Sequence, residues 1–200
     1  MQLLFSPTSP YVRKVRVFAL EKGLGPRLEL KEANPWPDPA AVSAFNPLGK
    51  VPALVLDDGS ALYDSPVICE YLDSLVPERP LIPARGPARW RALRQQALAD
   101  GMQDAAVSIV LERRRPAAER SSGAEQRAAD ALRRSVAALE PELEPATHAF
   151  DLGQIALACA LGYLEFRLAD LGLLRDHRAV DDWRRATGQR PSLVATRPPP

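Results

Sequence analysis

Short apolar runs alternate with amphipathic stretches in the first 75 residues of the chain. Residues 2–5 are apolar and predict a buried first strand. Ser9-Pro10 then supplies a hydroxyl N-cap and a proline at the first helical position. The residues that follow place an apolar stripe on one helical face, formed by Val12, Val15, Phe18 and Ala19. Leu28 and Leu30 alternate with charged residues, which predicts a half-buried second strand.

Two further strands and a helix complete this half. Residues 53–56 and 61–63 flank a short Asp-Gly turn, which is typical of a β-hairpin. Ser65-Pro66 repeats the N-cap and proline pair, and an apolar stripe follows it. The order strand, helix, strand and then strand, strand, helix predicts a small sheet covered by helices, the thioredoxin-like arrangement.

Beyond this half the pattern becomes helical throughout. Residues 76–87 are rich in proline and predict a linker. The expected helices cover residues 88–113, 122–139, 151–168 and 178–187. The third is apolar nearly all round, so it should lie at the centre of its domain, and Asp151 fits its N-cap. We therefore expect an α+β domain over residues 1–75, the linker, and an all-α domain over residues 88–200.

Composition excludes several classes of protein. The chain has 200 residues with 26 basic and 25 acidic side chains, so no strong field toward nucleic acid or a membrane is expected. The N-terminus does not read as a signal peptide, and the apolar run 152–164 is too short to span a bilayer. Cys69 and Cys159 form no CxxC motif, and His148 and His177 have no partners at ligand spacing. We expect packing roles for both cysteines, no metal and a cytoplasmic location.

The most specific chemical signal lies around Val51-Pro52 and Asp64-Ser65. A proline at the mouth of a core strand cannot donate to the ladder. If the Val51–Pro52 bond is cis, the Val51 backbone N–H and C=O turn outward, where they can pair with an extended peptide. Asp64-Ser65 opens a helix, whose spare N–H groups and dipole attract a carboxylate. A peptide backbone and a free α-carboxylate are the handles of glutathione.

Because of these residues, the chain resembles members of the cytosolic glutathione transferase superfamily, and the resemblance covers nearly its whole length. Within that superfamily it resembles the bacterial serine-type members. The resemblance implies transfer of the glutathione thiolate to small hydrophobic electrophiles. It places Ser9 where the thiol is activated, although Thr8 and Ser6 are close enough to be the donor instead. A plain structural role for Ser9 as an N-cap remains compatible, because capping uses the hydroxyl oxygen and leaves its proton.

The resemblance also assigns the remaining site residues. Those expected to bind glutathione, the co-substrate, are Lys50, Val51, Pro52, Asp64 and Ser65. A trans turn proline, a simple helix cap at Asp64-Ser65 and a solvated Lys50 are the alternative interpretations. Apolar or aromatic surface for the electrophile is expected from Tyr11, Trp36, Met102 and Tyr163. In the resembling family an acid such as Asp100 or Asp104 can reach glutathione across a dimer, or it can simply be solvated.

Two other functions stay open. One is a glutathione-dependent thiol oxidoreductase or isomerase, disfavoured because serine at position 9 cannot form a mixed disulfide. The other is a non-catalytic protein-interaction module, which would not need the glutathione residues. The resemblance implies a homodimer with a role in detoxification, and no nucleic-acid or membrane partner. The run Arg113–Arg115 is expected to complement a helix dipole rather than to bind nucleic acid.

Overall fold

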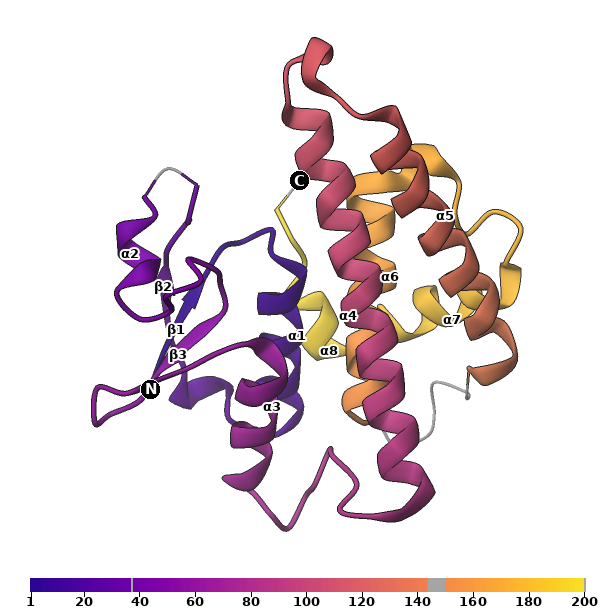
Figure 1. Cartoon of the computed structure of the whole chain (residues 1–200). Coiled ribbons are helices and arrows are strands. Elements are labelled where there is room, and N and C mark those ends of the chain that lie inside the picture. The colour runs from indigo at the N-terminus through magenta and orange to yellow at the C-terminus, as the bar shows by residue number, and fades with distance from the viewer. Residues whose placement is uncertain (37, 144–149, 200) are drawn as a thin grey trace. The chain divides into compact units, whose positions relative to one another are not determined.

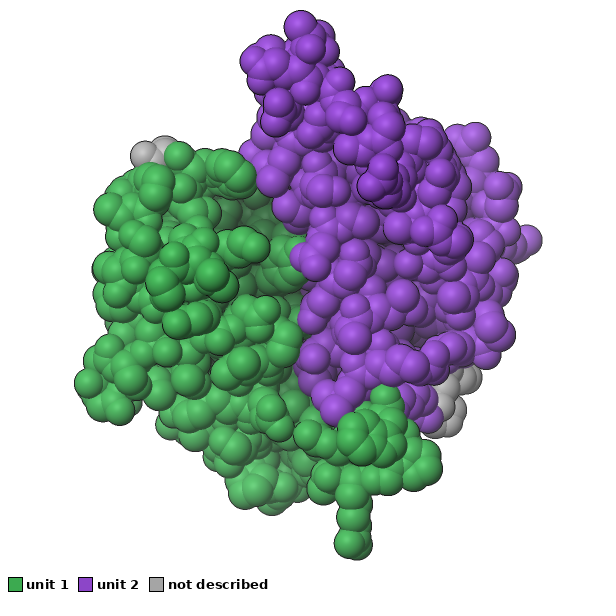
Figure 2. All heavy atoms as spheres, viewed as in Figure 1, with its two compact units in different colours: residues 1–90, 191–200 green, residues 91–190 purple. Residues whose placement is uncertain are grey.

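The computed structural model describes residues 1–36, 38–143 and 150–199. The chain forms two compact units, which Figure 2 shows in different colours. Unit 1 contains Met1–Trp90 together with the residues from Pro191 onward, and unit 2 contains Arg91–Arg190.

Unit 1 contains a four-stranded mixed sheet (Figure 1). The strands are β1 (Gln2–Phe5), β2 (Glu29–Glu32), β3 (Ala53–Val55) and β4 (Ala61–Leu62). Their spatial order is β2-β1-β3-β4, with β2 parallel to β1 and both β1–β3 and β3–β4 antiparallel. This topology confirms the expected strand–helix–strand unit followed by a hairpin.

Helices cover both faces of the sheet (Figure 1). On one face lie α1 (Pro10–Glu21) and α3 (Ser65–Ser74), which pack against each other. The opposite face carries α2 (Ala40–Ser43), whose Val42 packs with Leu4 and Ala53 in a buried cluster. Leu4 and Ala53 are register partners, so they point to the same face, while the alternate residues point toward α1 and α3.

The second strand differs from its expectation. All four residues of β2 are exposed, and Leu30 keeps 43% of its surface accessible. The prediction of a half-buried strand from Leu28 and Leu30 is therefore wrong. β2 lies at the edge of the sheet that the described residues form, beside β1, and alternation in sequence does not reveal how far the covering helices extend.

The segment after α3 is held by a buried lysine. Lys22, which follows α1, is fully buried, and its Nζ forms an ion pair with Asp73 on α3 at 2.8 Å. The same ammonium group donates to the backbone oxygens of Asp73, Val76 and Arg79. Asp73 also accepts hydrogen bonds from the N–H groups of residues 81 and 82. The first part of the expected linker is thus fixed to unit 1.

The short last helix of the chain belongs to unit 1. It is α8 (Pro191–Val194), which packs against α1. Arg13 Nη2 donates to the backbone oxygen of Leu193 at 3.1 Å, and Ser192 Oγ donates to Glu21. The sequence predicts one helical domain over residues 88–200, whereas the structure groups the residues from Pro191 onward with unit 1.

Unit 2 is helical. Its elements are most of α4 (Gly86–Arg114), α5 (Ser122–Leu139), α6 (Leu152–Leu168) and α7 (Arg178–Thr187). Within the described residues, 3-10 turns cover Gly25–Arg27, Ala117–Glu119, Glu140–Glu142 and Ala169–Leu171. The four long helices confirm those expected from sequence to within about two residues at each end.

The apolar helix α6 is the core of unit 2. Asp151 Oδ1 accepts from the Gln154 N–H at 3.1 Å, which confirms the expected N-cap. A Cβ added at Gly153 would come within 2.9 Å of the Ala92 carbonyl oxygen, so α4 and α6 approach closely there. Residues 152–171 are long and apolar enough to cross a membrane, yet 72% of that window is buried inside the protein. Burial of this kind is typical of a core helix.

Candidate functional site

The strand register brings the expected site segments of unit 1 to one edge of the sheet. Leu4 on β1 faces Ala53 on β3, so the chain leaves β1 toward Ser9 at the edge where Lys50–Pro52 enters β3. β4 runs antiparallel to β3, so Asp64-Ser65 follows it at this same edge. We call the edge formed by Ser9, Lys50–Pro52 and Asp64-Ser65 the site edge.

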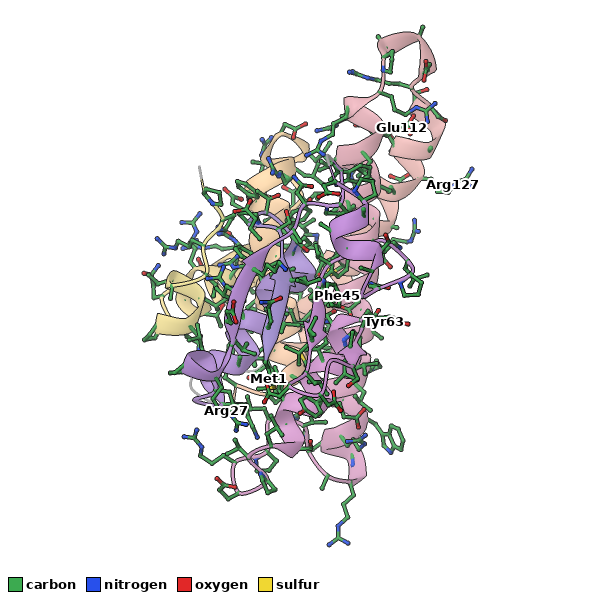
Figure 3. All side chains as sticks on the ribbon, turned by 90° about the vertical axis from the view of Figure 1, so that its left-hand side faces the viewer. Met1, Arg27, Phe45, Tyr63, Glu112 and Arg127 are labelled. Carbon is green, nitrogen blue, oxygen red and sulfur yellow. The ribbon has the colours of Figure 1, made fainter. Side chains whose placement is uncertain are left out.

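The opposite end of the sheet carries none of these residues. In Figure 3, Met1 and Arg27 mark the end at which β1 and β2 begin, whereas Tyr63 follows β4 at the site edge. The turn between β3 and β4 also lies at the far end, where the Ser60 hydroxyl donates to Asp58. Because β2 is parallel to β1, the loop that contains Trp36 leaves the sheet at the site edge.

A buried asparagine shapes the loop that enters β3. Asn46 is almost fully buried, and its Nδ2 donates to the Lys50 backbone oxygen at 2.7 Å. Its Oδ1 accepts from the Leu48 N–H at 3.0 Å. The side chain therefore fixes both ends of a turn and sets the path of the backbone into Val51. Sequence reasoning missed this role, although Asn-Pro before a glycine is a recognisable turn signal.

The Val51–Pro52 and Tyr63–Asp64 peptide bonds are both cis. Pro52 is buried, Val51 is partly buried, and the Lys50 side chain is exposed. Val51 packs against the cluster formed by Leu4, Val42 and Ala53. The side chain of Val51 thus belongs to the core of unit 1, which leaves its backbone as the part that can meet a ligand.

The start of α3 carries a carboxylate that makes no capping hydrogen bond. Asp64 occupies the N-cap position, but its side chain makes no capping hydrogen bond and is exposed. Within the described residues it also has no ion-pair partner. Ser65, the first residue of the helix, is almost fully buried. The interpretation that Asp64 serves only as a helix cap is therefore not supported by its side chain.

Ser9 caps α1 while keeping its hydroxyl proton. Its Oγ accepts from the Val12 N–H at 3.3 Å, and its own N–H donates to the Ser6 backbone oxygen at 3.1 Å. The hydroxyl has thus accepted one bond, and its O–H can still donate to an anion. Ser6 and Thr8 lie in the same short loop as Ser9, so all three hydroxyl groups lie near the site edge. All three residues are partly buried.

The expected electrophile residues fall in both units. Tyr11 on α1 is partly buried, and Trp36 is 65% exposed. Met102 on α4 and Tyr163 on α6 belong to unit 2, and both are buried. Burial raises the pKa of the Tyr163 phenol above its ordinary value, and the nearby charges of Arg167 and Arg114 oppose that shift. The phenol is therefore neutral at physiological pH.

The remaining reactive side chains lie elsewhere. Cys69 and Cys159 are buried and are not joined in a disulfide, as expected for packing residues. His177 Nδ1 lies 3.1 Å from Glu140 Oε2, and His148 lies outside the described residues. A hollow of about 510 Å³ between α6 and α7 is lined in part by Asp181, whose carboxylate is already paired with two arginines. None of the expected site residues lines it.

Comparison with known proteins identifies relatives over the full length of the chain. A family model for the N-terminal domain of glutathione S-transferase matches residues 8–75. The uncharacterized GST-like protein YibF of Escherichia coli is 37% identical over 202 residues, covering 100% of this chain and 99% of that protein.

Solved structures of glutathione transferase family members are also similar to the chain. A glutathione transferase family member from Pseudomonas fluorescens Pf-5 with bound glutathione is 46% identical, with a TM-score of 0.95 and coverage of 100% of this chain and 99% of that chain. Its structure with bound S-(propanoic acid)-glutathione is 45% identical at a TM-score of 0.90 and covers both chains completely.

Proposed function

Because the chain belongs to the glutathione transferase superfamily, we propose that it binds glutathione at the site edge and transfers the thiolate to small hydrophobic electrophiles. One observation carries the proposal: the register of β1, β3 and β4 gathers Ser9, Lys50–Pro52 and Asp64-Ser65 at one edge. A 46% identical relative holds glutathione, which supports the choice of ligand.

Each anchor has a chemical counterpart on glutathione. The Val51 backbone N–H and C=O pair with the peptide of the cysteinyl residue, as a strand edge pairs with an added strand. The Ser65 hydroxyl and the first N–H groups of α3 bind the γ-glutamyl carboxylate. The unused Asp64 carboxylate faces the γ-glutamyl ammonium group, and the exposed Lys50 ammonium group reaches the glycyl carboxylate.

Ser9 donates its free hydroxyl proton to the glutathione thiolate. A thiol of pKa about 8.5 is roughly 3% ionised at pH 7, and a shift of about two units would make it mostly thiolate. The gain is offset because a less basic thiolate is a weaker nucleophile, with a Brønsted coefficient of about 0.4–0.5. Net activation is then only about threefold, so most of the rate enhancement comes from holding thiolate and electrophile together.

The assignment of the electrophile to Tyr11 and Trp36 of unit 1 and to Met102 and Tyr163 of unit 2 stays a prediction. With a haloaromatic acceptor, the C–S bond forms, the C–Cl bond breaks, chloride leaves with the electron pair, and the thiol proton passes to solvent. A relative that binds S-(propanoic acid)-glutathione supports the view that an S-substituted glutathione fits this kind of site.

The site is tested by replacing both anchors at α3. Asp64→Ala with Ser65→Ala should weaken glutathione binding, measured by calorimetry, by more than tenfold, because two charge-assisted contacts are lost. The matched control is Asp58→Ala with Ser60→Ala, which removes the same residue types from the far end of the sheet. The control should bind glutathione like the native protein. Unchanged affinity in the α3 double variant would remove this site assignment.

A homodimer in the cytoplasm with a role in detoxification completes the proposal. Tyr63 and Val67 are large apolar residues exposed around the start of α3, and they offer a surface for a second copy. Buried, unlinked Cys69 and Cys159 agree with a reducing compartment. Light scattering should give twice the chain mass at micromolar concentration, and a persistent monomer would refute the dimer.

A further inference from the structure

The hollow of about 510 Å³ in unit 2 has a lining that the proposed function does not use. It is lined by α6, by α7 and by the turn between them (Figure 1). Part of this lining is apolar, because it includes four buried leucines, namely Leu164, Leu168, Leu173 and Leu174. Its volume falls in the range of about 300–1,000 Å³ that is typical of small-molecule sites. We call it the α6–α7 hollow.

Most of the charged side chains around the α6–α7 hollow are paired with one another. Asp181 pairs with two arginines of α7, each at 2.6 Å. Asp182 lies 3.6 Å from a third arginine, at the start of the same helix. Two further charged residues line the hollow, Arg175 and Glu165, and neither has an ion pair within the described part of the chain. The hollow therefore keeps one unpaired charge of each sign.

The turn between the helices places the unpaired arginine. Gly172 has a φ of 59°, a left-handed conformation that favours glycine. Its backbone oxygen accepts from the Arg175 N–H at 3.0 Å. A Cβ added at Gly172 would lie 3.4 Å from Cζ and Nη2 of Arg175 and 3.5 Å from its Nε. The guanidinium group thus lies against the glycine, which also lines the hollow, and has no acidic partner among the described residues.

The helix ends that meet at the hollow favour charges opposite to those of their own side chains. Glu165 stands in the last turn of α6, where the helix dipole favours a cation rather than a carboxylate. α7 begins with Arg178, and its N-cap residue His177 makes no side-chain capping hydrogen bond. The N-terminus of a helix favours an anion. A ligand with an ammonium group toward α6 and a carboxylate toward α7 would complement both ends and both unpaired side chains.

We propose that the α6–α7 hollow binds a small zwitterion with an apolar body, as in a free apolar amino acid or a dipeptide. The ligand ammonium group pairs with Glu165, and the ligand carboxylate pairs with the fork of Arg175, whose geometry matches a carboxylate. The apolar body packs on the buried leucines. The inference does not rest on the proposed function, because the residues that line the hollow belong to unit 2 and none is proposed to bind glutathione or the electrophile.

The first test compares four ligands on the native protein by calorimetry at about pH 6.5, where an α-amino group is protonated. Leucine and leucyl-leucine carry both charges, and the tighter of the two shows whether the hollow takes an amino acid or a peptide. N-acetylleucine lacks the ammonium group, and leucinamide lacks the carboxylate. Each should bind about tenfold or more weakly than leucine, because a charge-assisted hydrogen bond is lost. If N-acetylleucine binds as tightly as leucine, the hollow is a simple anion site and the inference is overturned.

The second test removes the partners on the protein. Arg175→Gln and Glu165→Gln should each weaken leucine binding about tenfold or more. Arg175→Gln should change leucinamide affinity less than about twofold, because that ligand has no carboxylate to lose a partner. The matched controls are Arg127→Gln on α5, at an exposed arginine labelled in Figure 3, and Glu32→Gln at an exposed acid of β2. Both controls should bind leucine like the native protein.

The remaining outcomes separate the hollow from the site edge. Asp64→Ala with Ser65→Ala should leave leucine affinity unchanged, and a loss there would place the ligand at the site edge and overturn the inference. It is also overturned if neither leucine nor leucyl-leucine binds at millimolar concentration, or if the control variants lose as much affinity as Arg175→Gln. Glutathione affinity, measured separately, tests the proposed function and is unaffected by any of these results.

Discussion

Lys22 Nζ lies 2.8 Å from Asp73 Oδ1, and the ammonium group that makes this contact is fully buried. Three further oxygens from the backbone of residues 73, 76 and 79 lie within 3.1 Å of the same nitrogen. One side chain therefore joins the end of α1 to the end of α3 and to the segment that leaves unit 1.

Replacing this lysine should destabilise the protein strongly. Lys22→Met leaves an acid and three carbonyl oxygens without their donor, so we expect the free energy of unfolding to fall by about 3 kcal/mol. Urea denaturation measures it. Lys31→Met, at an exposed position of β2, is the control and should stay within about 0.5 kcal/mol. A loss below about 1 kcal/mol at Lys22 would show that the network contributes little.

Removing the Ser9 hydroxyl should affect both stability and turnover. Ser9→Ala loses the N-cap of α1, at about 1 kcal/mol, and should lower kcat for conjugation about threefold, the net activation by its hydroxyl, with little change in glutathione affinity. Ser121→Ala is a matched control, because Ser121 caps α5 in the same way through the Ala124 N–H at 3.2 Å. It should cost similar stability and no activity. If Ser9→Ala keeps full turnover while Thr8→Ala or Ser6→Ala abolishes it, the donor was misassigned.

A thiol in place of that hydroxyl should change the reaction. Ser9→Cys puts a sulfur at a helix N-terminus, where the pKa of a thiol falls and its reactivity rises. The variant should lose conjugation and gain glutathionyl transfer. Its thiolate attacks the disulfide of a glutathionylated peptide, forms a mixed disulfide with the glutathionyl sulfur and releases the peptide thiolate, and a second glutathione then frees the cysteine and leaves as glutathione disulfide. Reduction of a glutathionylated peptide measures the gain. Efficient reduction by the native protein would instead favour the oxidoreductase function.

Stability should depend on pH through Asp181. Burial alone would raise the pKa of this carboxyl, but hydrogen bonds from Arg184 and Arg185 and their charges outweigh it and hold the pKa below its ordinary value. Unfolding therefore takes up a proton, so the stabilisation is present above about pH 4 and is lost as pH falls further.

The variant Asp181→Asn isolates this contribution. It should lower the free energy of unfolding by about 1 kcal/mol at pH 7, and the difference from the native protein should shrink below about pH 4. Asp182→Asn, whose pairing with Arg178 at 3.6 Å is exposed, should stay within about 0.5 kcal/mol at both pH values. A difference that is constant across this range would contradict the assignment.

Local signals account for most of what the sequence could predict. Caps such as Ser9 and Asp151 act within one helical turn, so the sequence alone places the helix starts. The gathering of the proposed site segments follows from strand order, which the alternation of strands and helices already restricts. The features that could not be predicted depend on contacts between residues that are far apart in the sequence.

Three features show this limit. Leu30 has the alternation of a half-buried strand, but its exposure depends on how far the covering helices reach. The ion pair of Lys22 with Asp73 spans 51 residues of sequence, and no local pattern marks either residue. The contact of Arg167 with Phe166 joins neighbours in sequence, yet the lack of an acidic partner for Arg167 among the described residues is visible only once the surrounding helices are placed.

The return of α8 to α1 makes unit 1 discontinuous along the chain, since its last element is encoded after the whole of unit 2. On the ribosome, the domain that starts first is therefore finished last. Until Leu193 and its neighbours emerge, Arg13 lacks the carbonyl acceptor that α8 supplies. A product truncated before α8 would therefore lack this hydrogen bond in the domain that carries the proposed glutathione residues.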